Sequence, residues 1–192
     1  MIVFNTPNLV TLSRIVLIPL IIGLYYLPEE WLSYHGKNIA ATVVFILAAL
    51  TDWLDGYLAR RLNQTSAFGA FLDPVADKFL VCASLLILVQ LGRLESLVAF
   101  VIIGREIAIS ALREWMAQIG ASRSVAVHML GKVKTVTQMV AIPFLLYDGK
   151  LFRLIDTRIW GTVLIYIAAV LTIWSMVYYL RKALPEIRAR AR

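Results

Sequence analysis

Four aspartates lie close together in a stretch of the sequence that is otherwise apolar. The stretch reads TDWLDGYLARRLNQTSAFGAFLDPVADKF, residues 51–79, and its aspartates are Asp52, Asp55, Asp73 and Asp77. The first two are three residues apart and the last two are four apart, so each pair lies on one face of a helix. Ionisable groups within a membrane are costly and default to a functional role. The spacing therefore predicts a polar site built from two helices.

The polar sequence LNQTS separates the two pairs and predicts a hairpin between antiparallel helices. At a rise of about 1.5 Å per residue, Asp55 and Asp73 each lie roughly 9 Å from the inner end of their helix, and Asp52 and Asp77 lie roughly 5 Å deeper. Small residues beside the aspartates let the helices approach closely; these are Gly56, Ala59, Gly69 and Ala70. The four carboxylates are expected to meet at matching depths.

Facing carboxylates disfavour one another's ionisation unless a cation lies between them. Hard oxygen ligands favour Mg²⁺ or Mn²⁺, and Mg²⁺ often shares carboxylates with substrate phosphates. The cluster contains no His or Cys, which argues against zinc. We expect a divalent metal site that binds a phosphate-containing ligand. The alternative is a set of solvated aspartates at helix ends, paired with Arg60, Arg61 and Lys78.

The elements that would position these residues are long apolar segments. The chain is 60% hydrophobic with a mean hydropathy of +0.79, well above an ordinary soluble domain. We predict an all-α, polytopic membrane protein that forms a single domain over residues 1–192. Its single cysteine, Cys82, permits no internal disulfide. Six segments approach the length needed to span a bilayer: residues 8–27, 39–61, 67–91, 95–118, 129–147 and 159–181.

Basic residues predict the orientation of these segments. The net charge is +7, and its Lys and Arg residues gather at segment ends, which indicates contact with membrane lipids and not with nucleic acid. The poorer side holds Lys37, Arg93, Lys150, Arg153 and Arg158. We therefore expect both termini and the aspartates on the cytoplasmic side. The basic tail RKALPEIRARAR is expected along the membrane surface, and no signal peptide is evident.

Aromatic residues near segment ends are expected to anchor the chain at the two membrane interfaces. These residues are Tyr25, Tyr26, Trp31, Trp160, Tyr178 and Tyr179.

The aspartate stretch resembles the signature of the CDP-alcohol phosphatidyltransferase family, D-x2-D-G-x2-A-R-x8-G-x3-D-x3-D. Every fixed position is met, at Asp52, Asp55, Gly56, Ala59, Arg60, Gly69, Asp73 and Asp77. Three further segments, NTPNLVTLSRI, REIAISALREW and GKVKTVTQMVAI, are similar to the bacterial branch that makes phosphatidylglycerophosphate. The resemblance implies synthesis of phosphatidylglycerophosphate and CMP from CDP-diacylglycerol and sn-glycerol 3-phosphate. It also implies a homodimer in the bacterial cytoplasmic membrane.

The resemblance assigns roles to individual residues. Asp52, Asp55 and Asp73 match metal ligands, and Asp77 matches a residue that touches the metal and takes the acceptor's proton. Positions that contact CDP-diacylglycerol in relatives correspond to Asn8, Thr11, Gly56, Arg60, Ser66 and Gly69. A carboxylate is a weak base at neutral pH, so positioning and electrostatics are expected to contribute more than basicity. We favour direct attack of the acceptor, because no Ser, Cys or His stands out as a nucleophile.

An acceptor that carries a phosphate needs a basic pocket apart from the carboxylates. We predict that this pocket is formed by Arg105, Arg113, Lys132 and Lys134, with Glu106 holding an arginine in place. Arg123 and Thr135 are weaker candidates. Positive-inside anchoring is the alternative for the two lysines, and a structural pair with Glu106 is the alternative for Arg105.

Three other functions remain open at this point. A family member could use another acceptor, and serine would not need the basic pocket whereas inositol phosphate would. A divalent-cation or proton-coupled transporter could use the aspartates as an ion site, but such proteins commonly show inverted repeats and interrupted helices. A non-catalytic assembly subunit would not need matched carboxylates.

Overall fold

The computed structural model describes residues 6–62, 67–121 and 129–190; within these ranges, the side chains of residues 6–8, 10, 52–62, 67, 70, 130, 189 and 190 are not described. The described chain is helical apart from its connections and one small hairpin. Its helices are α1 (Thr6–Tyr26), α2 (Tyr34–Leu62), α3 (Ala67–Gln90), α4 (Ser96–Gln118), α5 (Met129–Tyr147) and α6 (Thr157–Arg190). The all-α prediction is confirmed. The hairpin pairs β1 (Lys150–Leu151) with β2 (Ile155–Asp156) between α5 and α6.

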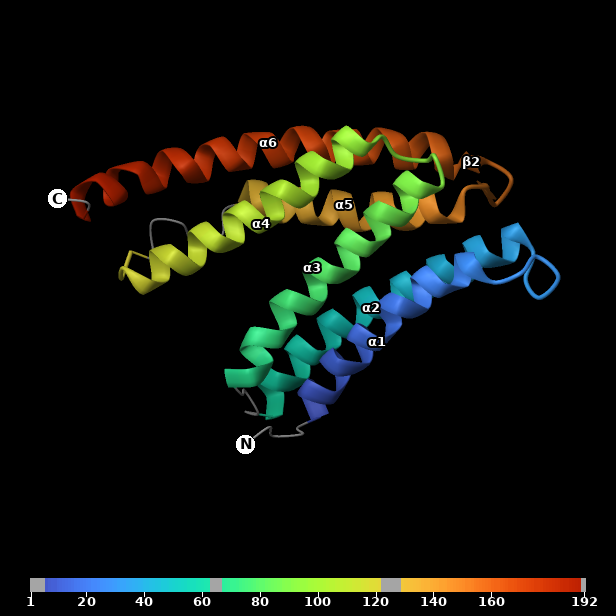
Figure 1. Cartoon of the computed structure of the whole chain (residues 1–192), viewed down its shortest axis with the longest axis horizontal. Coiled ribbons are helices and arrows are strands. Elements are labelled where there is room, and N and C mark those ends of the chain that lie inside the picture. Colours follow the sequence, from blue (N-terminus) through green and yellow to red (C-terminus); the bar gives the residue numbers. More distant parts are fainter. Residues whose placement is uncertain (1–5, 63–66, 122–128, 191–192) are drawn as a thin grey trace.

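The helices alternate in direction, so the connections α1–α2, α3–α4 and α5–α6 lie together at one end of the molecule (Figure 1). Glycine ends two of the helices. Gly92 after α3 and Gly120 after α4 have positive φ values of 66° and 73°. In each case the next backbone N–H bonds to a carbonyl five residues earlier, from Arg93 to Leu88 and from Ala121 to Met116. This is the geometry in which glycine terminates a helix most easily.

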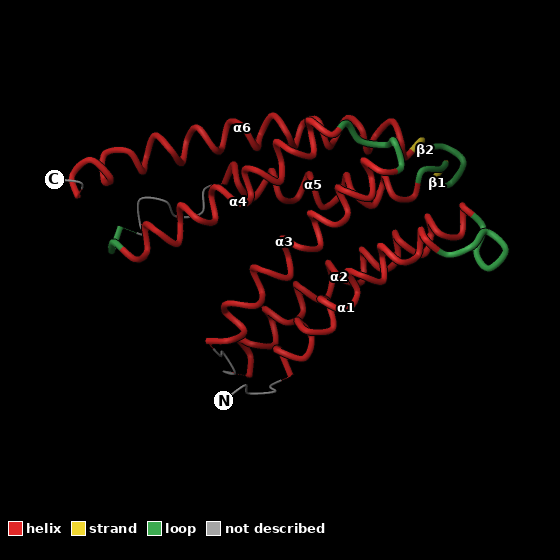
Figure 2. The backbone as a smooth tube through the Cα atoms, in the orientation of Figure 1, coloured by secondary structure: helices red, strands yellow, loops and turns green. Residues whose placement is uncertain are grey.

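Two groups of three helices diverge from the end that holds these connections (Figures 1 and 2). In one group α1 packs against α2 and α3, and in the other α6 packs along α5 and against α4. Contacts between α2 and α5 join the two groups, while α3 meets α4 and α5 more sparsely. The start of α3 and the far end of α4 are therefore well separated.

The core of the described chain is apolar and draws on most of its helices. Phe45, Leu85, Ile102, Ile142 and Ile165 are fully buried in it and come from α2 to α6. Large apolar side chains also cover the outward faces of the helices, as with Val16 on α1, Phe100 on α4 and Val170 on α6. A surface of this kind suits hydrocarbon better than water.

A buried arginine ties the joined ends of the helices together. Arg93 donates from Nη1 to the carbonyl oxygens of Leu145 (3.0 Å) and Leu146 (2.7 Å), at the end of α5. Its Nη2 donates to Asn38 Oδ1 (2.8 Å) and Tyr34 Oη (2.9 Å) at the start of α2. The last carbonyls of a helix have no partner within it, so this one side chain satisfies two of them.

The six predicted spans correspond to the six helices of the described chain, but their passage through a membrane remains a prediction. By length and composition, one helical stretch in the described ranges qualifies as a span: Thr157–Arg188, with 32 residues, in which a window of 18 residues has a mean hydropathy of 2.0. The stretch Thr11–Tyr26 is apolar but shorter. Helices α3 and α4 each carry at least three charged residues, which lowers their hydropathy.

The carboxyl-terminal end differs from the expectation. The sixth span was expected to end at residue 181, with the basic tail along the membrane surface, but α6 continues as one helix to Arg190. Pro185 lies inside this helix without ending it.

Candidate active site

Two of the four predicted carboxylates, Asp73 and Asp77, lie one turn apart on α3. Both side chains are half-buried. Thr11, fully buried on α1, donates a hydrogen bond from Oγ1 to Asp73 Oδ1 at 2.6 Å. This bond fixes the orientation of the carboxylate and ties α1 to α3. Thr11 was also predicted to contact CDP-diacylglycerol, and that contact stays a prediction.

Several predicted residues lie outside the part of the chain whose side chains are described. The helix α2 runs to Leu62, so the backbone of the first aspartate pair lies in its final turns. The side chains concerned are those of Asn8, Asp52, Asp55, Arg60 and Ser66, together with position Gly56. Gly69, by contrast, is described and is buried near the start of α3. Among the described side chains, no three acidic, histidine or cysteine residues form a cluster that could hold a metal.

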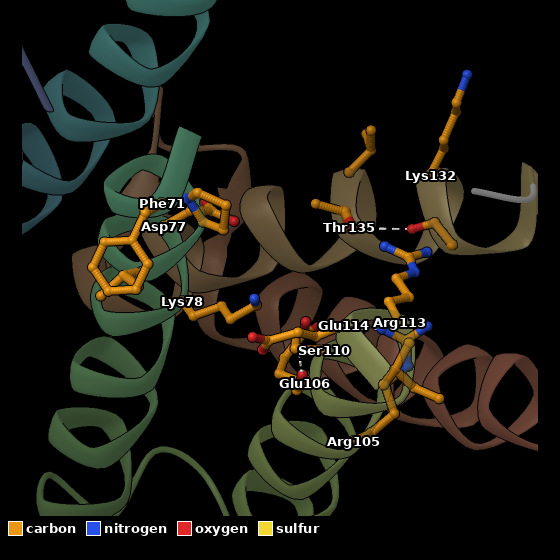
Figure 3. A pocket seen from close by; sticks show the side chains of 15 residues that line it. Phe71, Asp77, Lys78, Arg105, Glu106, Ser110, Arg113, Glu114, Lys132 and Thr135 are labelled. Carbon is orange, nitrogen blue, oxygen red and sulfur yellow. Dashed lines mark hydrogen bonds and ion pairs between the residues drawn. The ribbon is translucent and has the colours of Figure 1, made fainter. Parts of the chain in front are cut away.

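A cavity of about 960 Å³ opens between α3, α4 and α5 (Figure 3). Asp77 lines it from α3, Arg105 and Arg113 from α4, and Lys132 from α5. The cavity therefore brings the predicted proton acceptor together with three of the four predicted acceptor-phosphate residues. Sequence reasoning did not include several of its other lining residues, among them Phe71, Ser110 and Glu114. Of the two weaker candidates, Thr135 lines the cavity and Arg123 lies outside the described residues.

Lys134, the fourth basic residue of the prediction, lies deeper than expected. Its side chain is buried on α5 and its Nζ donates to Glu106 Oε1 on α4. It lines a second, smaller cavity of about 30 Å³ that it shares with Asp77 and Gln138. Glu106 was expected to hold an arginine, but Arg105 Nη1 is 3.8 Å from the carboxylate and the lysine is closer. The helices α4 and α5 are thus linked at the cavity by an ion pair.

The two arginines of α4 rest on α6, which sequence reasoning had not connected with the site. Arg105 Nη2 donates to Ser175 Oγ at 3.0 Å, and Arg113 Nη2 donates to Tyr179 Oη at 3.0 Å. Tyr179 was predicted to be an anchor at the membrane interface, and this is wrong because only 1% of it is exposed. Position near a segment end cannot tell a buried tyrosine from an interfacial one, so the sequence held no signal for this role.

The chain matches the family model of the CDP-alcohol phosphatidyltransferases over residues 4–174. The chain belongs to this family. It is 47% identical over 186 residues to the CDP-diacylglycerol--glycerol-3-phosphate 3-phosphatidyltransferase of Escherichia coli (strain K12), covering 96% of this chain and 97% of the relative. Proteins of the same name from Shigella flexneri serotype 5b (strain 8401) and Shigella sonnei (strain Ss046) match with the same identity and coverage.

Members of the CDP-alcohol phosphatidyltransferase family use a divalent metal, and the described donors fit one. Asp73 and Asp77 offer hard oxygen ligands one helical turn apart. Asp73 keeps one carboxylate oxygen on Thr11, so the hydrogen bond orients a ligand of this kind in the way that supporting residues orient metal ligands elsewhere. Of these two aspartates, only Asp77 lines the cavity that holds the basic residues.

Proposed function

We propose that this chain is an integral-membrane phosphatidyltransferase that makes phosphatidylglycerophosphate and CMP from CDP-diacylglycerol and sn-glycerol 3-phosphate. The printed name of relatives that match nearly the whole chain supports this activity. The observation that carries the acceptor assignment is the cavity, which is lined by Asp77 together with Arg105, Arg113 and Lys132. A carboxylate that can take the hydroxyl proton, beside several cations, is what a phosphate-bearing alcohol requires.

The charges of the cavity favour an anionic acceptor. Glu106 is paired with Lys134, so this carboxylate opposes the remaining cations less than its formal charge suggests. Arg113 and Lys132 line the cavity from different helices, and the exposed Lys132 side chain, which points away from Arg113 in Figure 3, is free to turn towards a phosphate bound there. Arginine offers a planar fork of donors and lysine a point charge, and both are suited to phosphate oxygens.

The four aspartates are proposed to form the part of the site that binds the lipid donor through a metal ion. Asp52, Asp55, Asp73 and Asp77 would hold Mg²⁺ or Mn²⁺, as the family signature implies. When bound, the ion supplies charge neutralisation for the pyrophosphate of the lipid donor. The residues proposed to contact the CDP-diacylglycerol itself are Asn8, Thr11, Gly56, Arg60, Ser66 and Gly69. Thr11 also acts through the Asp73 carboxylate that it holds.

Asp77 is placed to act on the acceptor's hydroxyl. The hydroxyl oxygen forms a bond to the phosphorus next to diacylglycerol, its proton passes to the Asp77 carboxylate, and the bond from that phosphorus to the CMP oxygen breaks. CMP leaves with the bonding electrons. The basic residues keep the acceptor in place during this exchange, and such positioning accounts for a large share of phosphoryl-transfer catalysis.

The cellular setting follows from the same proposal. Six spans in the bacterial cytoplasmic membrane would place the diverging helix ends, the aspartates and both termini on the cytoplasmic side, where glycerol phosphate is available. The shortest helix, α5, has 19 residues and is about 28 Å long at 1.5 Å per residue, which matches the hydrocarbon core. A homodimer is the expected assembly by family resemblance.

The activity is tested with purified protein, CDP-diacylglycerol, radiolabelled sn-glycerol 3-phosphate and Mg²⁺ or Mn²⁺. Lipid extraction should recover labelled phosphatidylglycerophosphate with an equal amount of CMP, and EDTA should abolish both products. Parallel reactions contain serine or inositol phosphate as the acceptor. Product from one of these and none from glycerol phosphate would overturn the acceptor assignment. Absence of CMP with every acceptor would overturn phosphatidyl transfer and favour the ion-transport alternative.

A further inference from the structure

Helix α6 holds the two arginines of the cavity through a pair of buried side chains. Ser175 and Tyr179 are four residues apart, so they lie on the same face of the helix. Ser175 Oγ donates to the carbonyl oxygen of Thr172 at 2.9 Å, which leaves its lone pairs to accept from Arg105. Tyr179 Oη accepts from Arg113. Each arginine therefore has its own acceptor on α6.

The ring of Tyr179 also contacts both arginines. The Cζ atom of Arg113 lies 5.1 Å from the ring centroid, and that of Arg105 lies 5.7 Å from it. Cations at such distances are attracted by the aromatic ring. Two guanidinium groups near one another repel, and a shared aromatic surface offsets part of that repulsion. The ring thus keeps the two charges together in the absence of an anion.

The phenol end of Tyr179 reaches the wall of the cavity. A Cβ atom built on Gly131 would lie 3.4 Å from Tyr179 Oη, so α5 passes close to the hydroxyl at a position that lines the cavity. Tyr179 itself is fully buried and is not among the lining residues. Tyr179 therefore lies behind the residues that line the cavity, where α4, α5 and α6 meet.

We propose that Tyr179 is a positioning residue that sets the plane of the Arg113 guanidinium and holds Arg105 and Arg113 as a preformed pair for the phosphate of the acceptor; this rests on the proposed acceptor pocket. Arginine recognises phosphate through a planar fork, so the orientation of the plane decides how many N–H groups face the ligand. A side chain held in its bound geometry loses less conformational entropy on binding. The hydroxyl of Tyr179 supplies that restraint.

Packing alone is the other role that Tyr179 could have, since it belongs to a small buried cluster with Ile109, Met116 and Ala183. The substitution Tyr179→Phe separates the two roles, because it keeps the ring and its packing and removes only the hydroxyl. The matched control is Tyr178→Phe, at the adjacent residue whose ring contacts that of Tyr179 edge-on at 5.8 Å.

The test measures KM for sn-glycerol 3-phosphate, KM for CDP-diacylglycerol and kcat for each variant. Tyr179→Phe is expected to raise KM for glycerol phosphate at least about 10-fold, as expected for the loss of one hydrogen bond to a charged group. KM for the lipid should stay within about twofold. Tyr178→Phe should change neither constant. An unchanged KM for glycerol phosphate in Tyr179→Phe, or an equal rise for both substrates, would overturn the inference.

A companion variant separates this inference from the pocket on which it rests. Arg113→Ala should raise KM for glycerol phosphate more than Tyr179→Phe does, and the double variant should be no worse than Arg113→Ala alone, because Tyr179 acts through Arg113. If Arg113→Ala raises KM and Tyr179→Phe does not, only the positioning role fails. If neither substitution changes KM for glycerol phosphate, the acceptor pocket itself is wrong.

Discussion

Asp77 is the residue at which the two groups of charged side chains meet. It lies one turn after Asp73 on α3 and lines the cavity that Arg105 and Arg113 enter from α4. It also borders the smaller cavity beside Lys134. A carboxylate in this position can face the metal site and the acceptor at the same time, which the proposed proton transfer requires.

We expect Asp77→Asn to fold and to bind divalent metal but to lose at least about 100-fold in turnover, because an amide cannot accept the acceptor's proton. CMP release gives the rate, and calorimetric titration with Mn²⁺ gives the metal affinity. Glu95→Gln, at an exposed residue before α4, is the matched control and should turn over normally. Turnover of Asp77→Asn within a few-fold of the unaltered protein would remove Asp77 as the base.

The sequence predicted several of the charged residues that line the cavity but not the residues that support them. Arg105 and Arg113 drew attention because charges within apolar segments are costly and need a reason. Nothing of that kind distinguishes Ser175 or Tyr179, since a hydroxyl near a helix end is ordinary in sequence. The partner of Glu106 was also missed, because contacts between α4 and α5 depend on how the helices cross. Spacing along one helix predicts neighbours on that helix only.

At the scale of elements, the helix positions were predictable and several ends were not. Apolar runs of about 20 residues locate α1 to α6, because a helix is the structure that satisfies its own backbone in an apolar setting. The α5–α6 connection contains a hairpin that was not predicted, with positive φ values at Phe152 and Arg153. Arg93 had been counted only as a charge on the outer side. Its partners come from α2 and α5, 52 to 55 residues away for Leu145 and Asn38, and no local pattern reports them.

Arg93→Ala should destabilise the joined ends of the helices. Asp148 lies 3.2 Å from Arg93 Nε, so the substitution leaves a half-buried carboxylate and two carbonyls without their main partner. Breaking a buried pair on one side costs about 3 kcal/mol, equivalent to a fall in Tm of roughly 6 to 12 °C for a chain of this size. Thermal unfolding in detergent, followed by tryptophan fluorescence, measures this fall.

The control for this prediction is Arg158→Ala, because Arg158 pairs with the same Asp148 carboxylate from the protein surface. Arg158 Nη1 lies 3.9 Å from Asp148 Oδ1, and 60% of the Arg158 side chain is exposed. Exposed ion pairs contribute little, so Arg158→Ala should shift Tm by about 2 °C at most. Equal shifts in Arg93→Ala and Arg158→Ala would show that Arg93 has no special role at these helix ends.

At the scale of the whole molecule, the alternating helices place the candidate active site and the Arg93 network at opposite ends. The candidate active site lies where the two groups of helices diverge, and Arg93 lies where they join (Figure 1). The bias of Lys and Arg towards the diverging end predicts that this end is cytoplasmic.

The orientation is tested with single cysteines in a Cys82→Ala background. The two substitutions are Leu154→Cys and Arg188→Cys. Leu154 lies in the highly exposed hairpin between α5 and α6, and Arg188 lies near the exposed end of α6. A membrane-impermeant maleimide should label residue 154 in intact spheroplasts and residue 188 only after the membrane is disrupted. The Cys82→Ala parent should take up no label. The reverse pattern, or labelling of both from outside, would contradict the proposed topology.

The division into two groups of helices has a consequence for the chemistry. Asp73 and Asp77 stand on α3, in one group, whereas Arg105 and Arg113 stand on α4, in the other. In the proposed reaction, donor and acceptor are therefore held by separate groups of helices, and the distance between the attacking oxygen and the phosphorus depends on the angle between these groups. Since a misplacement of about 1 Å can slow a reaction about 100-fold, we expect turnover to depend on the lateral pressure of the surrounding lipids.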